Sequence, residues 1–92
     1  MITSFKHKGL ENFFMKADRS GIEQKWVPRI KTRLTVIDAA ETIDAINLPG
    51  YDLHQLKGDR ADIGSISVSG NWRITFRFID GDAEILNLED YH

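Results

Sequence analysis

The spacing of the apolar residues changes once along the chain, and this change restricts the fold more than any other feature. In residues 10–37, apolar side chains recur every three or four positions, as on one face of an α-helix. From residue 51 onward they recur at every second position, as on one face of a β-strand. The segment Leu48-Pro49-Gly50 separates the two patterns. The sequence therefore predicts helices followed by a sheet.

Two helices are expected before this boundary. A short amphipathic helix is predicted by the apolar stripe Leu10, Phe13, Phe14 and Ala17. Ser20-Gly21 interrupts it, and a second stripe runs from Ile22 to Ile37. Pro28 fits only the first turn of a helix, where backbone N–H groups have no helical partner. The regular part of the second helix should therefore begin near residues 25–28.

The second half predicts a meander of antiparallel strands. Ile66 and Val68 alternate with serines, and residues 72–78 alternate strictly between large apolar and polar side chains. The pairs Gly70-Asn71 and Asp80-Gly81 are placed for two hairpin turns. A last strand is expected over about 82–88 and a short initial strand over 2–5. The predicted fold is α+β, with two N-terminal helices on one face of a mostly antiparallel sheet of about four to five strands and the other face open.

Length and composition are those of one globular domain. The chain has 92 residues, of which 41% are apolar and 28% charged, so we expect a single domain over residues 1–92. It contains no cysteine, which excludes disulfides and thiolate metal sites and fits a reducing compartment. No apolar run resembles a secretion signal or approaches a membrane span. We therefore expect a cytoplasmic protein that does not associate with membranes.

The distribution of charge bears on whether the partner is a nucleic acid. The formal net charge of -2 argues against tight binding of phosphate. Residues 80–92 carry five acidic groups and no Lys or Arg, however, so residues 1–79 carry a net charge of +3. A local cationic patch can therefore exist away from the C-terminal segment.

Six residues supply the groups that metal-free cleavage of RNA requires. They are His54, Lys57, Arg73, Asp90, Tyr91 and His92. This cleavage needs a base that takes the proton of the ribose 2′-OH, a cation that stabilises the phosphorane-like charge, and an acid that protonates the leaving 5′ oxygen. Imidazole suits both proton transfers, and Lys or Arg suits the charge. The Asp carboxylate can orient an imidazole or act as a base, and the Tyr can stack on a nucleobase or donate a proton.

These residues also have ordinary structural interpretations. A lone His on a strand is commonly a surface or core polar residue, and the segment 90–92 is by default a frayed chain end. Arg73 and Arg77 at alternate positions fit a solvated sheet face. His54, Asp90 and His92 match the ligand types of a metal site but lack the compact spacing of metal motifs, so no metal is expected.

Other conspicuous residues are interpreted as structural. A solvated helix face accounts for the basic residues Lys25, Arg29, Lys31 and Arg33. His7 is interpreted as structural or exposed. Trp26 and Trp72 are interpreted as core and interface anchors.

Several motifs, in order and over nearly the whole chain, resemble one family. They are residues 2–10, 53–60, 71–76, 81–83 and 89–92. In these segments the chain is similar to HigB toxins, the plasmid-maintenance killer proteins of the RelE/ParE superfamily. The resemblance implies a RelE-like microbial RNase fold, metal-independent cleavage of mRNA in the ribosomal A site of the 30S subunit, and inhibition of translation. It also implies neutralisation by a HigA-type helix-turn-helix antitoxin, with operator DNA bound only through the antitoxin complex.

The resemblance also assigns roles to individual residues. It points to His54, Asp90, Tyr91 and His92 as the catalytic group. Lys57 and Arg73 resemble phosphate-stabilising neighbours, and Arg60 and Asn71 are expected, with them, to contact RNA or ribosome. No cofactor is implied.

One departure from the family keeps a second function open. Related toxins often carry a basic residue beside the Asn-Trp-Arg segment, where this chain has the neutral Ser69 and Gly70. With the acidic net charge, this motivates an alternative, a degenerate toxin that binds antitoxin or ribosome without cleaving. The intact His54, Asp90 and His92 favour the nuclease. A metal-dependent hydrolase is a third hypothesis.

Overall fold

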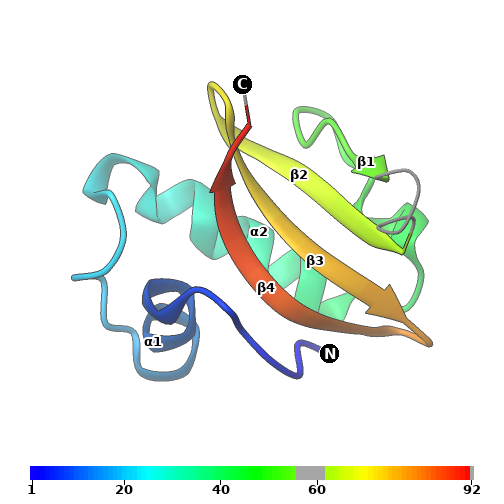
Figure 1. Cartoon of the computed structure of the whole chain (residues 1–92), viewed down its shortest axis with the longest axis horizontal. Helices are drawn as coiled ribbons and strands as arrows, with labels where there is room; N and C mark the ends of the chain where they lie inside the picture. Colours follow the sequence, from blue (N-terminus) through cyan, green and yellow to red (C-terminus); the bar gives the residue numbers. More distant parts are fainter. Residues whose placement is uncertain (56–61, 92) are drawn as a thin grey trace.

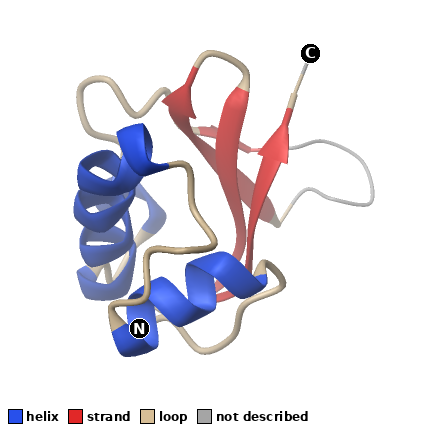
Figure 2. Ribbon diagram, turned by 90° about the vertical axis from the view of Figure 1, so that its left-hand side faces the viewer, coloured by secondary structure: helices blue, strands red, loops and turns tan. Residues whose placement is uncertain are grey.

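The elements of the chain form a helical layer and a sheet layer (Figures 1 and 2). The structure is a computed structural model that describes residues 1–55 and 62–91. In this part of the chain the helical elements are α1 (Lys8–Lys16), η1 (Gln24–Trp26), α2 (Val27–Ala39) and η2 (Ile43–Ile46). The strands are β1 (His54–Gln55), β2 (Ile63–Ser69), β3 (Trp72–Ile79) and β4 (Asp82–Asp90). The expected α+β arrangement is confirmed.

Helix α1 is fixed at both ends by local chemistry. The Nδ1 atom of His7 accepts the backbone N–H of Leu10 at 3.1 Å, which satisfies one of the unpaired donors of the first turn. Ala17 ends the helix in the left-handed conformation, with φ of 57°. Leu10 is fully buried, and Phe13 and Phe14 pack against the core. Of the two interpretations of His7, structural or exposed, the structural one is therefore correct.

Helix α2 begins where the proline allows it. Pro28 lies in its first turn, as expected, and the 3-10 turn η1 precedes it. The side chains of Ile30, Leu34 and Ile37 are at most 1% exposed and form the centre of the core. The predicted apolar stripe is thus the face that α2 turns to the sheet (Figure 2).

The sheet is an antiparallel meander in the order β1-β2-β3-β4. Both predicted turn pairs connect neighbouring strands, and they carry the left-handed residues that hairpin turns require: φ is 56° at Gly70, 52° at Asp80 and 84° at Gly81. Ile66, Ile74 and Phe76 face the helices and are at most 1% exposed. The register therefore places the intervening residues on the opposite side of the sheet.

We refer to the sheet side turned away from the helices as the open face. Its central rows are made by the cross-strand pairs His54 with Ser65, Ser65 with Thr75, and Arg73 with Glu89. No helix of the described residues covers this face (Figure 2). Ser65 and Thr75 are nevertheless only 1% and 2% exposed. Two longer side chains of the same face bind them: Arg73 donates to Ser65 Oγ, and Glu89 accepts from the Thr75 hydroxyl.

The expected initial strand is reduced to two isolated bridges. Ile2 pairs with Ala83 and Phe5 with Leu86, both in parallel orientation. Between these contacts β4 has a bulge, where Ile85 adopts a φ of 57° and its backbone N–H donates to Ser4 Oγ at 2.8 Å. The bulge interrupts the regular edge that a continuous fifth strand would need. The N-terminal segment therefore follows β4 (Figure 1) without extending the sheet as a regular strand.

The basic residues of α2 are only partly a solvated face. Arg33 Nε donates to Ser67 O at 2.6 Å, and Arg29 Nη1 donates to Val68 O at 3.1 Å. These carbonyls lie at a bulge of β2, where the register with β3 shifts between Ser67 and Ser69. The guanidinium of Arg33 also lies 4.4 Å from the ring centre of Tyr51. Arg29 is nevertheless exposed and Arg33 partly exposed, so these residues belong to the solvated face while their guanidinium groups also join α2 to β2.

Two tryptophans connect the same parts of the fold. The rings of Trp26 and Trp72 lie 5.4 Å apart at an interplanar angle of 49°, and Trp26 packs against the core. The expectation of a core anchor is confirmed for Trp26, and Trp72 packs against its ring. The role as interface anchors stays a prediction. In the described part of the chain no helix is both long and apolar enough to cross a bilayer.

Candidate active site

A shallow depression of about 360 Å³ lies beside the β2–β3 turn, at the end of the open face. It is lined by Asp52, His54, Ser65, Gly70, Asn71, Arg73 and Tyr91. We refer to it as the polar depression. Sequence analysis singled out His54, Asn71, Arg73 and Tyr91, and the fold brings these four together from β1, the β2–β3 turn, β3 and the end of β4.

Arg73 is held in place by hydrogen bonds from its whole guanidinium group. Nε donates to Ser65 Oγ at 2.9 Å and Nη2 donates to Ser65 O at 3.0 Å. Nη2 also donates to Asp52 O, and Nη1 to Asp52 Oδ2 at 3.4 Å. Its side chain is 12% exposed. The interpretation of Arg73 as part of a solvated sheet face is therefore wrong, because its cation is fixed at the wall of the polar depression.

Asp52 connects Arg73 to His54. While Oδ2 accepts from Arg73, Oδ1 lies 3.1 Å from His54 Nε2. The hydrogen bond with His54 lowers the pKa of Asp52 below its usual value, and the positive charges of His54 and Arg73 lower it further. An ionised carboxylate can only accept hydrogen bonds, so Nε2 of His54 carries a proton. In a neutral imidazole this leaves Nδ1 as the basic nitrogen.

Tyr91 closes the other side of the polar depression. Its backbone N–H donates to Asn71 O at 2.8 Å, which ties the end of the chain to the β2–β3 turn. Its hydroxyl is buried and has no hydrogen-bond partner within the described residues. A buried hydroxyl without a partner costs free energy. The Tyr91 hydroxyl is therefore a polar group that the described part of the fold leaves unsatisfied.

The register separates Asp90 from this group. Asp90 lies opposite Trp72, on the helix side of the sheet, and it does not line the polar depression. Its neighbour Glu89 lies opposite Arg73 on the open face and accepts the hydroxyl of Thr75 at 2.5 Å. The structure thus brings Glu89, in place of Asp90, to the face that carries Arg73.

The remaining expected site residues are not placed. Lys57, Arg60 and His92 lie outside the described residues. Within residues 1–55 and 62–91, no three His, Cys, Asp or Glu side chains gather closely enough to hold a metal ion. The alternative metal site of His54, Asp90 and His92 includes one residue outside that range.

Sequence reasoning missed three residues of this region: Asp52, Ser65 and Glu89. Asp52 had a usable signal, because residues two apart on an extended segment share a face and His54 is two positions away. Ser65 and Glu89 had none. Their proximity to Arg73 depends on the register of β2 and β4 against β3, which bulges shift in both pairs.

Comparisons with known proteins identify the family. The family model of the "RelE-like toxin of type II toxin-antitoxin system HigB" matches residues 3–92. The chain belongs to this HigB-like toxin family. A curated relative, Endoribonuclease HigB of Proteus vulgaris, is 56% identical over 92 residues, which are 100% of each chain. The expected family is confirmed.

A solved structure agrees with the fold expected of a HigB-like toxin. YafQ from E. coli strain BL21(DE3) superposes with a TM-score of 0.57 at 12% identity, covering 98% of this chain and 91% of that chain. At this identity the likeness shows the fold alone. Membership in a type II toxin family also gives the HigB-like chain an antitoxin as its partner.

Proposed function

We propose that this chain is a toxin that cleaves mRNA on the ribosome and thereby inhibits translation. The observation that carries the proposal is the His54 imidazole, held by Asp52 beside the fixed guanidinium of Arg73. The relative from Proteus vulgaris bears the name endoribonuclease. Both support an RNA-cleaving enzyme whose site is the polar depression.

The reaction is a transfer within the RNA that needs no water and no metal. Nδ1 of His54 takes the proton of the ribose 2′-OH, whose oxygen attacks the adjacent phosphorus. The guanidinium of Arg73 stabilises the charge that builds on the phosphoryl oxygens. The bond from phosphorus to the 5′ oxygen breaks, and a proton donor in the C-terminal segment, Tyr91 or His92, protonates that oxygen. The products are a 2′,3′-cyclic phosphate and a 5′-hydroxyl.

Asp52 acts as a positioning residue in this mechanism. By accepting from Nε2 of His54 it fixes the tautomer in which Nδ1 is the base, and by accepting from Arg73 it fixes the cation. Sequence reasoning gave the role of orienting an imidazole to Asp90. The position of Asp90 opposite Trp72 favours Asp52 for that role.

The charge of the chain supports dependence on the ribosome. The chain has a net charge of -2, and two arginines of α2 are engaged with β2 carbonyls. Because the chain offers few phosphate contacts, the ribosome has to align the RNA with the site. Lys57, Arg60, Asn71 and Arg73 are the residues we assign to RNA and ribosome contact. We further propose that the chain is cytoplasmic and that its antitoxin is of the HigA type. Operator DNA is bound only through the antitoxin complex.

Mapping the ends of the RNA fragments tests this mechanism. Programmed ribosomes should yield 2′,3′-cyclic phosphate and 5′-hydroxyl ends, at a rate far above that on the same RNA alone. His54→Ala should lose cleavage with its circular dichroism spectrum unchanged. A 5′-phosphate end, or loss of activity at a chelator dose that leaves ribosomes intact, would falsify the mechanism.

A non-catalytic toxin relative is the second candidate. The neutral Ser69-Gly70 turn at the rim of the polar depression favours it, because no cation stands there. Growth on induction separates the two candidates. If the chain is a nuclease, induction of the wild type should arrest growth and induction of His54→Ala should not. If it is a non-catalytic relative, neither should arrest growth.

A further inference from the structure

A second depression, of about 330 Å³, lies on the open face of the sheet. Its lining includes Lys6, Thr75, Ile85, Asn87 and Glu89. We refer to it as the β4 depression, because the last three of these residues belong to β4. The mechanism proposed above makes no use of it.

The β4 depression adjoins the polar depression at two cross-strand pairs. Thr75 lies opposite Ser65 and Glu89 lies opposite Arg73, and both Ser65 and Arg73 line the polar depression. Residues directly opposite each other in an antiparallel sheet have Cβ atoms about 4.5–5.5 Å apart. An RNA strand with a phosphate beside Arg73 can therefore place an adjacent nucleotide in the β4 depression.

Ile85 lines the β4 depression in a conformation that its side chain disfavours. Its φ is 57° at the bulge of β4, and the residue is 42% exposed. A β-branched residue is strained in this left-handed region, which glycine and asparagine adopt readily. An exposed isoleucine also contributes little to the core. Packing therefore gives no reason for isoleucine at this position, and strained residues of this kind cluster at ligand sites.

The other lining side chains place polar groups beside this apolar surface. Within the described residues, the Asn87 amide has no hydrogen-bond partner and no ion pair engages the exposed Lys6. Glu89 accepts the Thr75 hydroxyl through Oε2, and a carboxylate can accept several hydrogen bonds at once. An apolar surface beside donors and acceptors fits the face and the edge of a nucleobase, and a lysine fits its phosphate.

We propose that the β4 depression binds a nucleotide that flanks the scissile phosphate, with its base on Ile85 and the edge of the base on Asn87 and Glu89. This subsite rests on the proposed nuclease function and extends it by one nucleotide. An ionised carboxylate only accepts hydrogen bonds, so the subsite should favour a base that carries an amino group over uracil. Lys6 contributes a phosphate contact beside it.

Binding to ribosomes whose A-site codon cannot be cut tests the proposal without relying on cleavage. The probe is an mRNA with 2′-deoxyribose at that codon, and the reference is an mRNA that ends just before it. The wild type should bind ribosomes with the deoxy codon more tightly than the reference ribosomes. Ile85→Gly and Asn87→Ala should each bind the deoxy codon at least about fivefold more weakly than the wild type, and bind the reference equally well.

Ile79→Gly is the matched control, because Ile79 is also 42% exposed but lines neither depression. It should bind both ribosomes like the wild type, although glycine weakens a strand. Ile85→Gly relieves the left-handed strain, so its urea midpoint should not fall below that of the wild type.

Two results would overturn the subsite. One is a wild type that binds the two ribosomes equally, and the other is wild-type affinity for the deoxy codon in both Ile85→Gly and Asn87→Ala. Failure of the nuclease proposal would be seen separately, as ordinary mRNA that the wild type leaves uncut.

Discussion

Gly9 and Gly21 touch backbone to backbone: a Cβ on Gly9 would stand 2.3 Å from the carbonyl oxygen of Gly21. The first turn of α1 and the loop that follows the helix are therefore in direct contact. A Cβ on Gly21 would likewise lie 2.8 Å from the Cα of Gly9. Only glycine fits on either side, because both obstacles are backbone atoms.

This contact predicts that Gly9→Ala destabilises the domain even though alanine favours helices. Overpacking against a backbone atom should cost about 1–3 kcal/mol of the free energy of unfolding. Urea unfolding followed by circular dichroism measures this cost. The neighbouring Lys8→Ala, whose side chain is 81% exposed, should stay within about 0.5 kcal/mol of the wild type. An unchanged midpoint for Gly9→Ala would mean that the two segments do not touch.

The His7 cap predicts a loss of stability in mild acid. Burial lowers the pKa of His7 below its usual 6.5, and Nδ1 can accept the Leu10 N–H only while it is unprotonated. The unfolded chain therefore binds the proton more readily than the folded one. The stability that His7 contributes is complete above pH 6.5 and decreases as the pH falls below that value.

Thermal unfolding between pH 7.5 and 5.0 checks this prediction. His7→Asn keeps a capping side chain without a titrating imidazole, so its unfolding temperature should fall less steeply with acid than that of the wild type. Parallel curves for the two proteins would show that the cap does not titrate.

Asp52→Asn should lower the rate of RNA cleavage about tenfold to a hundredfold without unfolding the domain. Asparagine keeps an acceptor for Arg73, and the backbone carbonyl of residue 52 still binds the guanidinium. It no longer forces the proton onto Nε2 of His54, so the population of the basic Nδ1 tautomer falls. Nitrogen chemical shifts of the His54 ring report the tautomer directly.

Asp62→Asn is the matched control for that variant. Asp62 also accepts from an arginine, with Oδ2 at 2.6 Å from Nε of Arg77, but it lines no part of the polar depression. Its removal should leave the cleavage rate and the His54 tautomer unchanged. If the two variants cleave equally well, Asp52 has no positioning role.

Tyr91→Phe should separate activity from stability. The substitution removes a buried hydroxyl without a partner, so the free energy of unfolding should stay constant or rise by up to about 1 kcal/mol. Cleavage of mRNA on ribosomes should fall at least about tenfold if that hydroxyl meets the RNA. Unfolding curves and single-turnover cleavage are measured on the same preparation. Full activity in this variant would assign the role of proton donor to His92.

The main elements could be predicted because local chemistry determines them. Pro28 restricted the start of α2, and Gly70 and Gly81 marked hairpin turns that their positive φ values require. Alternation in residues 72–78 assigned Ile74 and Phe76 to the core. Each of these signals lies within a few residues of the structure it specifies.

The features that could not be predicted depend on distant segments. Alternation gave no sign of the bulge at Ile85, which interrupts β4 and limits the N-terminal segment to isolated bridges. The charge of Arg29 and Arg33 indicated a solvated face. Their contacts with β2 carbonyls could not be predicted, because nothing in their own helix marks those carbonyls. Asp90 was assigned to the site by its chemistry and by resemblance, and only the register against Trp72 shows on which side of the sheet it lies.

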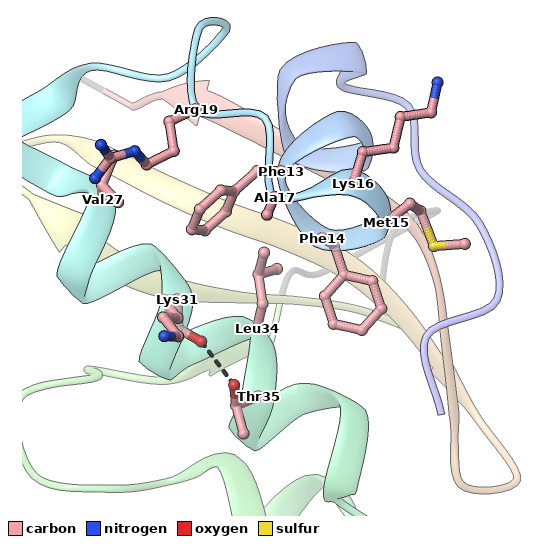
Figure 3. A pocket seen from close by; sticks show the side chains of 10 residues that line it. All are labelled: Phe13, Phe14, Met15, Lys16, Ala17, Arg19, Val27, Lys31, Leu34 and Thr35. Atoms are coloured by element: carbon pink, nitrogen blue, oxygen red, sulfur yellow. Dashed lines mark hydrogen bonds between the residues drawn. The ribbon is translucent and has the colours of Figure 1, made fainter.

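Helix α2 contributes to both surfaces of the molecule. Lys31 and Thr35 line a groove between α1 and α2 (Figure 3). Arg29 and Arg33 bind the carbonyls of Val68 and Ser67 in β2, just before the turn whose Gly70 and Asn71 line the polar depression. Arg29, Lys31 and Arg33 alternate between these two surfaces within little more than one helical turn. A displacement of α2 would therefore move the lining of this groove and the turn at the rim of the polar depression together.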